Sequence, residues 1–265
     1  MPAIAYSRAR GVFRPRSGGS ARLRRGALTA ACLIVALAVF FVVNWAYQVY
    51  RKPGELLAPV SASGFKTPQA TWRSYGSLFE YYSTGDLSPE FLAALAQVEA
   101  EGNPVARTYW RWKWSWNPFE IYRPASSALG MFQITDGTFA VARKYCIRDH
   151  QVVRDGPWRD WRSCWFNRLY FRTLPSHAVE MTAAYLHQGV EDTLAARRIK
   201  KASLAQKQRL AAVIHLCGAA KGDAFARRGF QASGGDKCGD HSLSGYLSRI
   251  EQMRRRFEKL RRLQS

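Results

Sequence analysis

The chain has 265 residues, of which 47% are hydrophobic and 13% aromatic, and its formal net charge is +21. This apolar content suits a folded core and excludes an intrinsically disordered protein, and the length allows one good-sized domain with appendages. Residues 1–52 contain nine Lys or Arg and no acid, so 31 basic and 19 acidic residues remain for the rest. Both parts are basic, which predicts an anionic partner.

An uncharged stretch of 24 residues, from Ala27 to Tyr50, follows the first arginines. At about 1.5 Å per residue, a helix of this length crosses a hydrocarbon core of about 30 Å. A cleaved signal peptide has an apolar stretch of only about 7–15 residues before a small-residue cleavage site. Because this stretch is longer and runs into interface-type residues such as Trp45 and Tyr47, we expect a retained transmembrane helix over residues 27–50.

The arginines before this stretch set its expected orientation. Basic residues that flank a first span stay in the cytoplasm, which predicts a cytoplasmic tail over residues 1–26 and places everything after about Arg51 outside the cytoplasm. We therefore expect no nucleic acid, and an anionic polymer outside the membrane is the better partner. The arginines are Arg8, Arg10, Arg14, Arg16, Arg22, Arg24 and Arg25.

The next segment, PGELLAPVSASGFKTP over residues 53–68, is rich in Pro, Gly, Ser and Ala. Residues 51–67 are therefore expected to form a linker, followed by one folded domain over residues 68–265. Apolar side chains recur at helical spacing in this domain without a competing series of strands, so it is predicted to be mainly α. One expected helix carries the aromatic stripe from Trp72 to Tyr82, and a second begins after Ser88. Three more are expected over residues 177–188, 204–216 and 243–263.

Four cysteines lie beyond the expected span, in a compartment where disulfides persist: Cys146, Cys164, Cys217 and Cys238. Their spacing does not suggest zinc, and we expect no metal. Four cysteines allow three pairings, of which proximity in the sequence favours 146 with 164 and 217 with 238. Free buried thiols are the alternative.

The stretch LSPEFLAALAQVEAEGNP, residues 87–104, predicts a helix. The Ser88 hydroxyl can accept an unpaired backbone N–H, and Pro89 suits the first helical position because it has no N–H. Gly102 and Pro104 indicate where the helix ends.

Glu99 lies in the last turn of this helix and shares an apolar stripe with Leu92 and Leu95. An apolar wall disfavours an ionised carboxylate, and so does the partial negative charge at a helix C-terminus. Glu99 therefore has the position expected of a general acid, which must carry a proton. The alternative is a helix-end glutamate that turns to water. Glu180 and His177, at another helix start, are expected to have capping or supporting roles, and His215 is expected to be a core histidine.

The segment TYWRWKWSWN, residues 108–117, alternates four tryptophans with charged or polar residues. A period of two places the indoles of Trp110, Trp112, Trp114 and Trp116 on one side of an extended segment. They could stack on sugars, with Trp112 and Trp114 as candidate substrate-binding residues beside a cleft. A hairpin packed onto the domain and a contact with a membrane interface are the other interpretations.

Glu99, Asn103 and Pro104 keep the spacing of a Glu-Ser-x-x-Asn-Pro helix end, and Gly130 to Gln133 (GMFQ) follow 31 residues after the glutamate. Together these segments resemble the lytic transglycosylase family (soluble lytic transglycosylase, goose-lysozyme-like), whose second motif is Gly-Leu-Met-Gln. The resemblance covers about residues 87–253. It includes a tyrosine near the start of the last helix, Tyr246, and an altered form of the family's Tyr-Asn-Ala-Gly element at residues 215–218.

The resemblance implies a lysozyme-like transglycosylase domain that needs no cofactor. The implied reaction cleaves the β-1,4 bond between N-acetylmuramic acid and N-acetylglucosamine in peptidoglycan glycan strands, with Glu99 as the catalytic residue and 1,6-anhydro products. The resemblance further implies that the domain is periplasmic and the span lies in the inner membrane. The sequence offers no obvious second catalytic carboxylate, whereas most glycosidases need two. The substrate-binding residues implied are Gly130, Met131, Phe132, Gln133 and Tyr246.

Two departures from the family pattern keep alternatives open. Ala100 stands where the family has serine after the glutamate, and Leu216 replaces the family's asparagine. The alternatives are a lysozyme-type peptidoglycan hydrolase on the same fold and a membrane-tethered protein that binds peptidoglycan without cleaving it.

Overall fold

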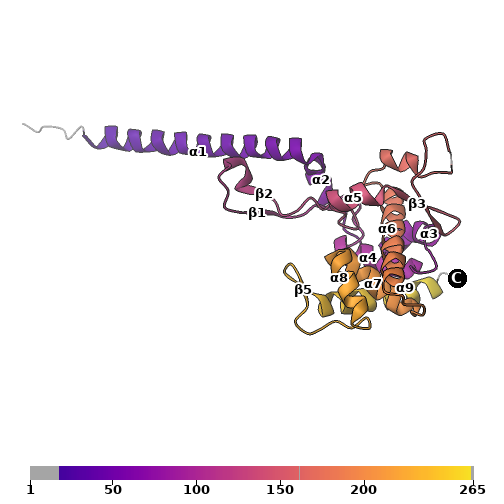
Figure 1. Cartoon of the computed structure of the whole chain (residues 1–265). Coiled ribbons are helices and arrows are strands. Elements are labelled where there is room, and N and C mark those ends of the chain that lie inside the picture. The colour runs from indigo at the N-terminus through magenta and orange to yellow at the C-terminus, as the bar shows by residue number, and fades with distance from the viewer. Residues whose placement is uncertain (1–17, 161, 264–265) are drawn as a thin grey trace, which may run out of the picture. The chain divides into compact units, whose positions relative to one another are not determined.

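The computed structural model describes residues 18–160 and 162–263, in an N-terminal unit that ends at Tyr47 and a compact unit that starts at Gln48. Helix α1 (Gly18–Arg51) covers the described part of the N-terminal unit, and its last turn belongs to the compact unit (Figure 1). Residues 22–51 of α1 are long and apolar enough to cross a membrane, as expected for residues 27–50. Of the arginines expected in the cytoplasm, Arg8, Arg10, Arg14 and Arg16 lie outside the described residues.

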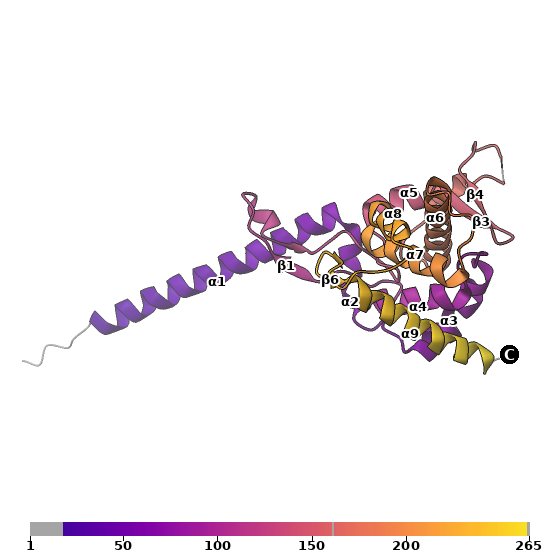
Figure 2. The same cartoon turned by 60° about the horizontal axis from the view of Figure 1, so that its bottom comes forward.

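Helices form the core of the compact unit, which confirms the prediction of a mainly α domain. Helix α4 packs against α3 and α9, and α7 packs against α6, α8 and α9. Figure 2 shows α9, in yellow, alongside α3 and α4. Phe79, Phe91, Leu210 and Phe257 are among the fully buried side chains. The bounds are α3 (Pro68–Tyr81), α4 (Pro89–Ala100), α5 (Asp136–Ala142), α6 (Pro175–Ala196), α7 (Leu204–Cys217), α8 (Ala219–Arg227) and α9 (Leu243–Arg262).

Capping residues set the starts of three predicted helices. Ser88 Oγ accepts the Phe91 N–H at 3.3 Å ahead of α4. Ser203 and Gln206 form a reciprocal capping box at α7, in which each side chain pairs with the other residue's backbone N–H. Ser242 caps α9 in the same way as Ser88 caps α4. The helix starts expected at residues 89, 204 and 243 are thereby confirmed.

Short antiparallel hairpins connect these helices. No series of strands is expected from the sequence. Strand β1 (Trp110–Trp112) pairs with β2 (Tyr122–Pro124), β3 (Tyr145–Arg148) with β4 (Gln151–Arg154), and β5 (Lys237–Cys238) with β6 (His241–Ser242). Between β3 and β4 the two turn residues, Asp149 and His150, have φ of 47° and 62°. Two positive φ angles give the tight turn whose twist matches that of the paired strands.

The segment expected to be a linker packs against the domain and belongs to the same compact unit. Residues 53–61 form a 3-10 turn (Pro53–Leu57) and the short helix α2 (Ala58–Ser61). The Ser61 carbonyl accepts the side-chain amide of the fully buried Asn103 at 2.7 Å. Glu55 is also fully buried, and it pairs with Lys52 at 3.1 Å and with Arg107. The folded body therefore begins at the end of α1 and not near Pro68.

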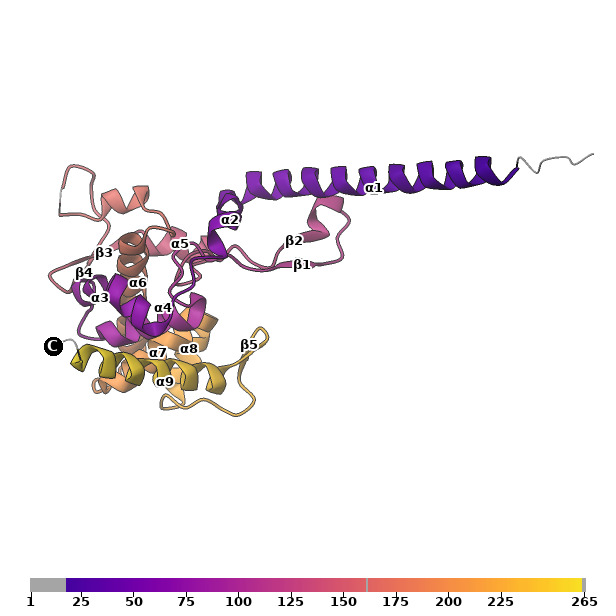
Figure 3. The same cartoon turned by 180° about the vertical axis from the view of Figure 1, so that it is seen from behind.

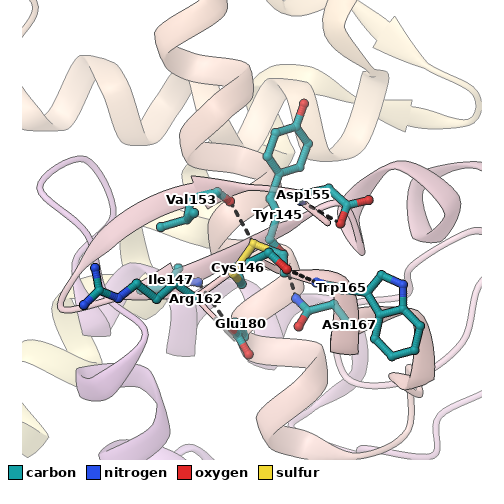
Figure 4. Close-up of a disulfide and its surroundings, with 12 residues drawn as sticks. Tyr145, Cys146, Ile147, Val153, Asp155, Arg162, Trp165, Asn167 and Glu180 are labelled. Carbon is teal, nitrogen blue, oxygen red and sulfur yellow. Dashed lines mark hydrogen bonds between the residues drawn. A yellow bond between two sulfur atoms is a disulfide. The ribbon is translucent and has the colours of Figure 1, made fainter. Parts of the chain in front are cut away.

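Both disulfides that sequence proximity favoured are present, Cys146–Cys164 and Cys217–Cys238, which close loops with sequence separations of 18 and 21 residues. Figure 4 shows the first of them beside β3. Asn167 donates its side-chain amide to the Tyr145 carbonyl at 2.8 Å in the same region. Each disulfide restricts the unfolded chain, so its loss costs about 2–5 kcal/mol of stability.

Glu180 supports β3 from helix α6. Its Oε1 accepts the Ile147 N–H at 3.0 Å (Figure 4). Its Oε2 accepts the Tyr170 hydroxyl at 2.6 Å. Burial raises the pKa of Glu180, and these hydrogen bonds offset only part of that effect. The supporting role expected of this residue is confirmed.

This buried carboxyl predicts a pH dependence of stability. Since its pKa is higher in the folded chain, its stabilising contribution is complete below the usual glutamate value of about 4.3 and is lost as the pH rises through the folded value. The free energy of unfolding of Glu180→Gln minus that of wild type should therefore increase as the pH rises towards neutrality. Urea unfolding of both chains in detergent across this pH range measures the difference. Parallel curves for the two chains would contradict the assignment.

Candidate active site

A cleft of about 820 Å³ opens at the C-terminal end of α4. Its walls come from segments that lie far apart in the sequence: the end of α4, residues 107–111 leading into β1, the loop before α5, the end of α7, the turn between β5 and β6, and the start of α9. Figure 3 shows β5 next to the first turn of α9. The cleft therefore depends on the packing of the whole compact unit.

Glu99 lies in the last turn of α4 and lines this cleft. The helix ends at Ala100, and the next residue, Glu101, adopts a left-handed conformation with φ of 48°. The Gly102 N–H returns to the Ala96 carbonyl at 3.1 Å. This end fixes the direction of the last turn. The Glu99 side chain is 15% exposed, so its carboxyl is largely shielded and still reaches the cleft.

Tyr246 and His215 flank the Glu99 carboxyl. Tyr246, in the first turn of α9, donates its hydroxyl to Glu99 Oε1 at 2.5 Å. Burial raises the pKa of Tyr246 well above its usual range, and the nearby Glu99 charge acts in the same direction, so the phenol keeps its proton and donates. His215 Nε2, from the end of α7, lies 3.6 Å from the same oxygen. Among the described residues, no hydrogen bond engages Oε2, which leaves that oxygen for a ligand in the cleft.

The second motif forms a tight turn along one wall. Gly130 has φ of 82°, and a Cβ at this position would lie 2.2 Å from the Arg172 carbonyl oxygen, so a larger residue does not fit. Gln133 also has a positive φ, 46°, and its side-chain amide donates to the Gly130 carbonyl at 2.9 Å. Gln133 lines the cleft. The turn thus presents one polar side chain at a fixed place.

The neighbouring motif residues have other surroundings. Met131 and Phe132 are fully buried in the hydrophobic core, so their side chains do not line the cleft. They anchor the turn to the core instead. Asn103, the other polar motif residue, holds α2 through Ser61. Of the implied binding residues, the structure brings Gln133 and Tyr246 to the cleft with Glu99, while Gly130 shapes the turn.

The cleft is positively charged. Two carboxylates line it, from Glu99 and Asp240, against five basic side chains among the described residues. Such an excess raises the local concentration of an anionic ligand. All five line the cleft, and one of them, Arg107, is partly neutralised by the buried Glu55. The five are Arg107, Arg111, Lys221, Lys237 and Arg249.

The candidate binding residues Trp112 and Trp114 are exposed and do not line this cleft. From the tryptophan-rich segment, the cleft is lined by residues 108, 109 and 111 instead, next to Arg107. Trp110 and Trp112 pack against Tyr122 of the paired strand in tilted arrangements, with ring centroids 5.2 and 4.7 Å from that of Tyr122. The interpretation of a hairpin packed onto the domain by its tryptophans therefore holds for Trp110, whose indole N–H reaches the buried Glu55, and not for Trp112, Trp114 and Trp116, which are exposed.

Sequence reasoning missed two residues of the cleft. His215 was expected to be a core histidine, and the altered family element in which it lies was the available signal for its place beside Glu99. Asp240 lies in the turn between β5 and β6 and belongs to no motif; the Cys217–Cys238 disulfide ties this turn to the end of α7 beside the cleft.

No protein-family model, curated protein or solved structure matches this chain. Within the described residues, no group of three or more His, Cys, Asp or Glu side chains is arranged to hold a metal ion. What the cleft can do is therefore inferred from its own geometry and from the resemblance of its motifs.

Proposed function

We propose that the chain is a membrane-anchored lytic transglycosylase with a lysozyme-like domain that cleaves the peptidoglycan glycan strand at N-acetylmuramic acid. The observation that carries the proposal is the contact of Tyr246 with Glu99, which joins two of the family's motif positions, 147 residues apart, at one carboxyl. The positive walls of the cleft add support, because the peptide stems of peptidoglycan carry carboxylates.

In this mechanism Glu99 acts twice. Its Oε2 first gives a proton to the glycosidic oxygen, the bond from C1 of N-acetylmuramic acid breaks, and the substrate's acetamido group stabilises the cation at C1. The Glu99 carboxylate then takes the proton from the C6 hydroxyl as that oxygen bonds to C1. The product is a 1,6-anhydro ring, and the acid is regenerated. Tyr246 holds Oε1 throughout, which fixes the direction in which Oε2 gives and takes the proton.

A lysozyme-type hydrolase is the second candidate, and Asp240 is the observation that favours it. A second carboxylate in the same cleft could activate water, as in glycosidases with two acids. The two reactions differ in their products, since hydrolysis leaves a reducing sugar. Mass spectrometry of the soluble fragments released from purified sacculi separates them: anhydro ends support the transglycosylase, reducing ends support the hydrolase, and binding without release supports a non-catalytic protein.

The proposed location gives a topology prediction. If α1 crosses the inner membrane with its arginines in the cytoplasm, a reporter that is active only outside the cytoplasm should be active when fused after Ser265. The protein should also sediment with the membranes. Activity of a cytoplasm-only reporter at the same site would overturn this topology.

A further inference from the structure

The hairpin of β1 and β2 exposes three tryptophans whose side chains neither fill the core nor line the cleft. Trp112, Trp114 and Trp116 are 62%, 81% and 93% exposed. Figures 1 and 3 show the hairpin reaching away from the helices that form the core. A cluster of indoles exposed to water is unfavourable because of the apolar area that it leaves hydrated. Such a cluster usually indicates a surface that contacts a partner.

The tip of this hairpin is tied to the last turn of α1. Gln48 donates its side-chain amide to the Phe119 carbonyl at 2.6 Å, and Arg51 pairs with Glu120 at 2.5 Å. The uncharged stretch of α1 ends at Tyr50. Since about 20 residues suffice to cross a hydrocarbon core, the last turn of a 24-residue stretch lies at the headgroup level. The hairpin tip is thereby held at the same level.

From this geometry we infer that the β1–β2 hairpin lies in the headgroup region of the membrane that α1 crosses, with Trp112, Trp114 and Trp116 as its contact residues. Indoles suit this region because each has an apolar body and an N–H that reaches water or headgroups. Lys113, which is exposed and lies between Trp112 and Trp114 in the chain, fits the phosphates of anionic lipids. The inference rests on α1 crossing the membrane and is independent of the proposed enzymatic activity.

The same segment has a second side, because Arg111 lines the Glu99 cleft. Successive side chains of a strand point to opposite faces, so the indoles of the neighbouring residues 110 and 112 point away from the side on which Arg111 lies. This favours lipid over glycan as the ligand of the indoles, since a glycan bound in the cleft would contact residues 107, 108, 109 and 111.

The full chain, reconstituted in vesicles of phosphatidylethanolamine and phosphatidylglycerol, provides the test. The emission of wild type minus that of a Trp112→Phe/Trp114→Phe/Trp116→Phe variant isolates the three indoles. Most of this difference emission should be quenched when the lipids carry bromine near the headgroup end of their acyl chains, because bromine quenches only nearby indoles. Trp158→Phe is the matched control: Trp158 is exposed after β4, and its difference emission should keep its intensity.

Two results would overturn the inference. One is a difference emission of the three indoles that brominated lipid leaves unchanged. The other is a difference emission that responds to added glycan strands and not to brominated lipid, which would assign the indoles to the glycan. Neither result bears on release of anhydro products, so failure here and failure of the proposed enzymatic function are distinguishable.

Discussion

Replacing Glu99 by glutamine should lower the release of 1,6-anhydro-muropeptides by at least about 10²-fold, the lower end of what general acid–base catalysis contributes. Glutamine keeps the size of the side chain and can still accept the Tyr246 hydroxyl, but it can neither give nor take a proton. The loss should appear in the rate of the chemical step. Quantified mass spectrometry of fragments from sacculi, with equal amounts of folded protein, measures it.

The matched control is Glu101→Gln. Glu101 carries the same charge two residues away, but its exposed side chain lies beyond the helix end and does not line the cleft. This variant should release products at close to the wild-type rate. Glu99→Gln should still fold and bind glycan strands, because the glutamine fits the same space. Wild-type release of anhydro products by Glu99→Gln would remove the basis for both the mechanism and the motif alignment.

The parts of the fold that the sequence predicts well are those set by local interactions. Ser88 and Pro89 start α4 through a cap whose partners lie within three residues, and the apolar stripe with Glu99 follows from helical periodicity. The disulfide pairing follows from short separations in the chain. In each case the residues that decide the structure are close neighbours in the sequence.

Other features depend on contacts between distant segments and had no such signal. The composition of residues 53–68 indicates a tether, yet the fully buried Glu55 and the Ser61 carbonyl, which accepts the Asn103 amide, dock this segment. The Glu55 partners Arg107 and Trp110 lie 52 and 55 positions further along the chain. The alternation from Trp110 to Trp116 predicts an extended segment, but it does not tell which surface the indoles contact. The docking of Glu55 therefore had to be found in the structure.

Glu55 joins the end of α1 to the cleft-bearing domain, and its replacement carries the second large expected effect. Lys52, Arg107 and the Trp110 indole N–H, the last at 2.9 Å, converge on its carboxylate. Lys52 and Arg107 themselves have little exposed side-chain surface. Burial lowers the pKa of Lys52, and the Glu55 charge works against that effect. Removing the carboxylate would leave two shielded cations and an indole N–H without their shared acceptor.

Glu55→Ala should therefore lower the free energy of unfolding by about 3–5 kcal/mol, the usual cost of removing one partner of a buried ion pair. Glu120→Ala is the matched control, because Glu120 also holds two basic residues, Arg51 and Arg123, but in a partly exposed pair that contributes at most about 1 kcal/mol. Urea unfolding of the full chain in detergent, followed by tryptophan emission, compares the two. Equal midpoints for both variants would show that Glu55 does not dock the segment between the anchor and the domain.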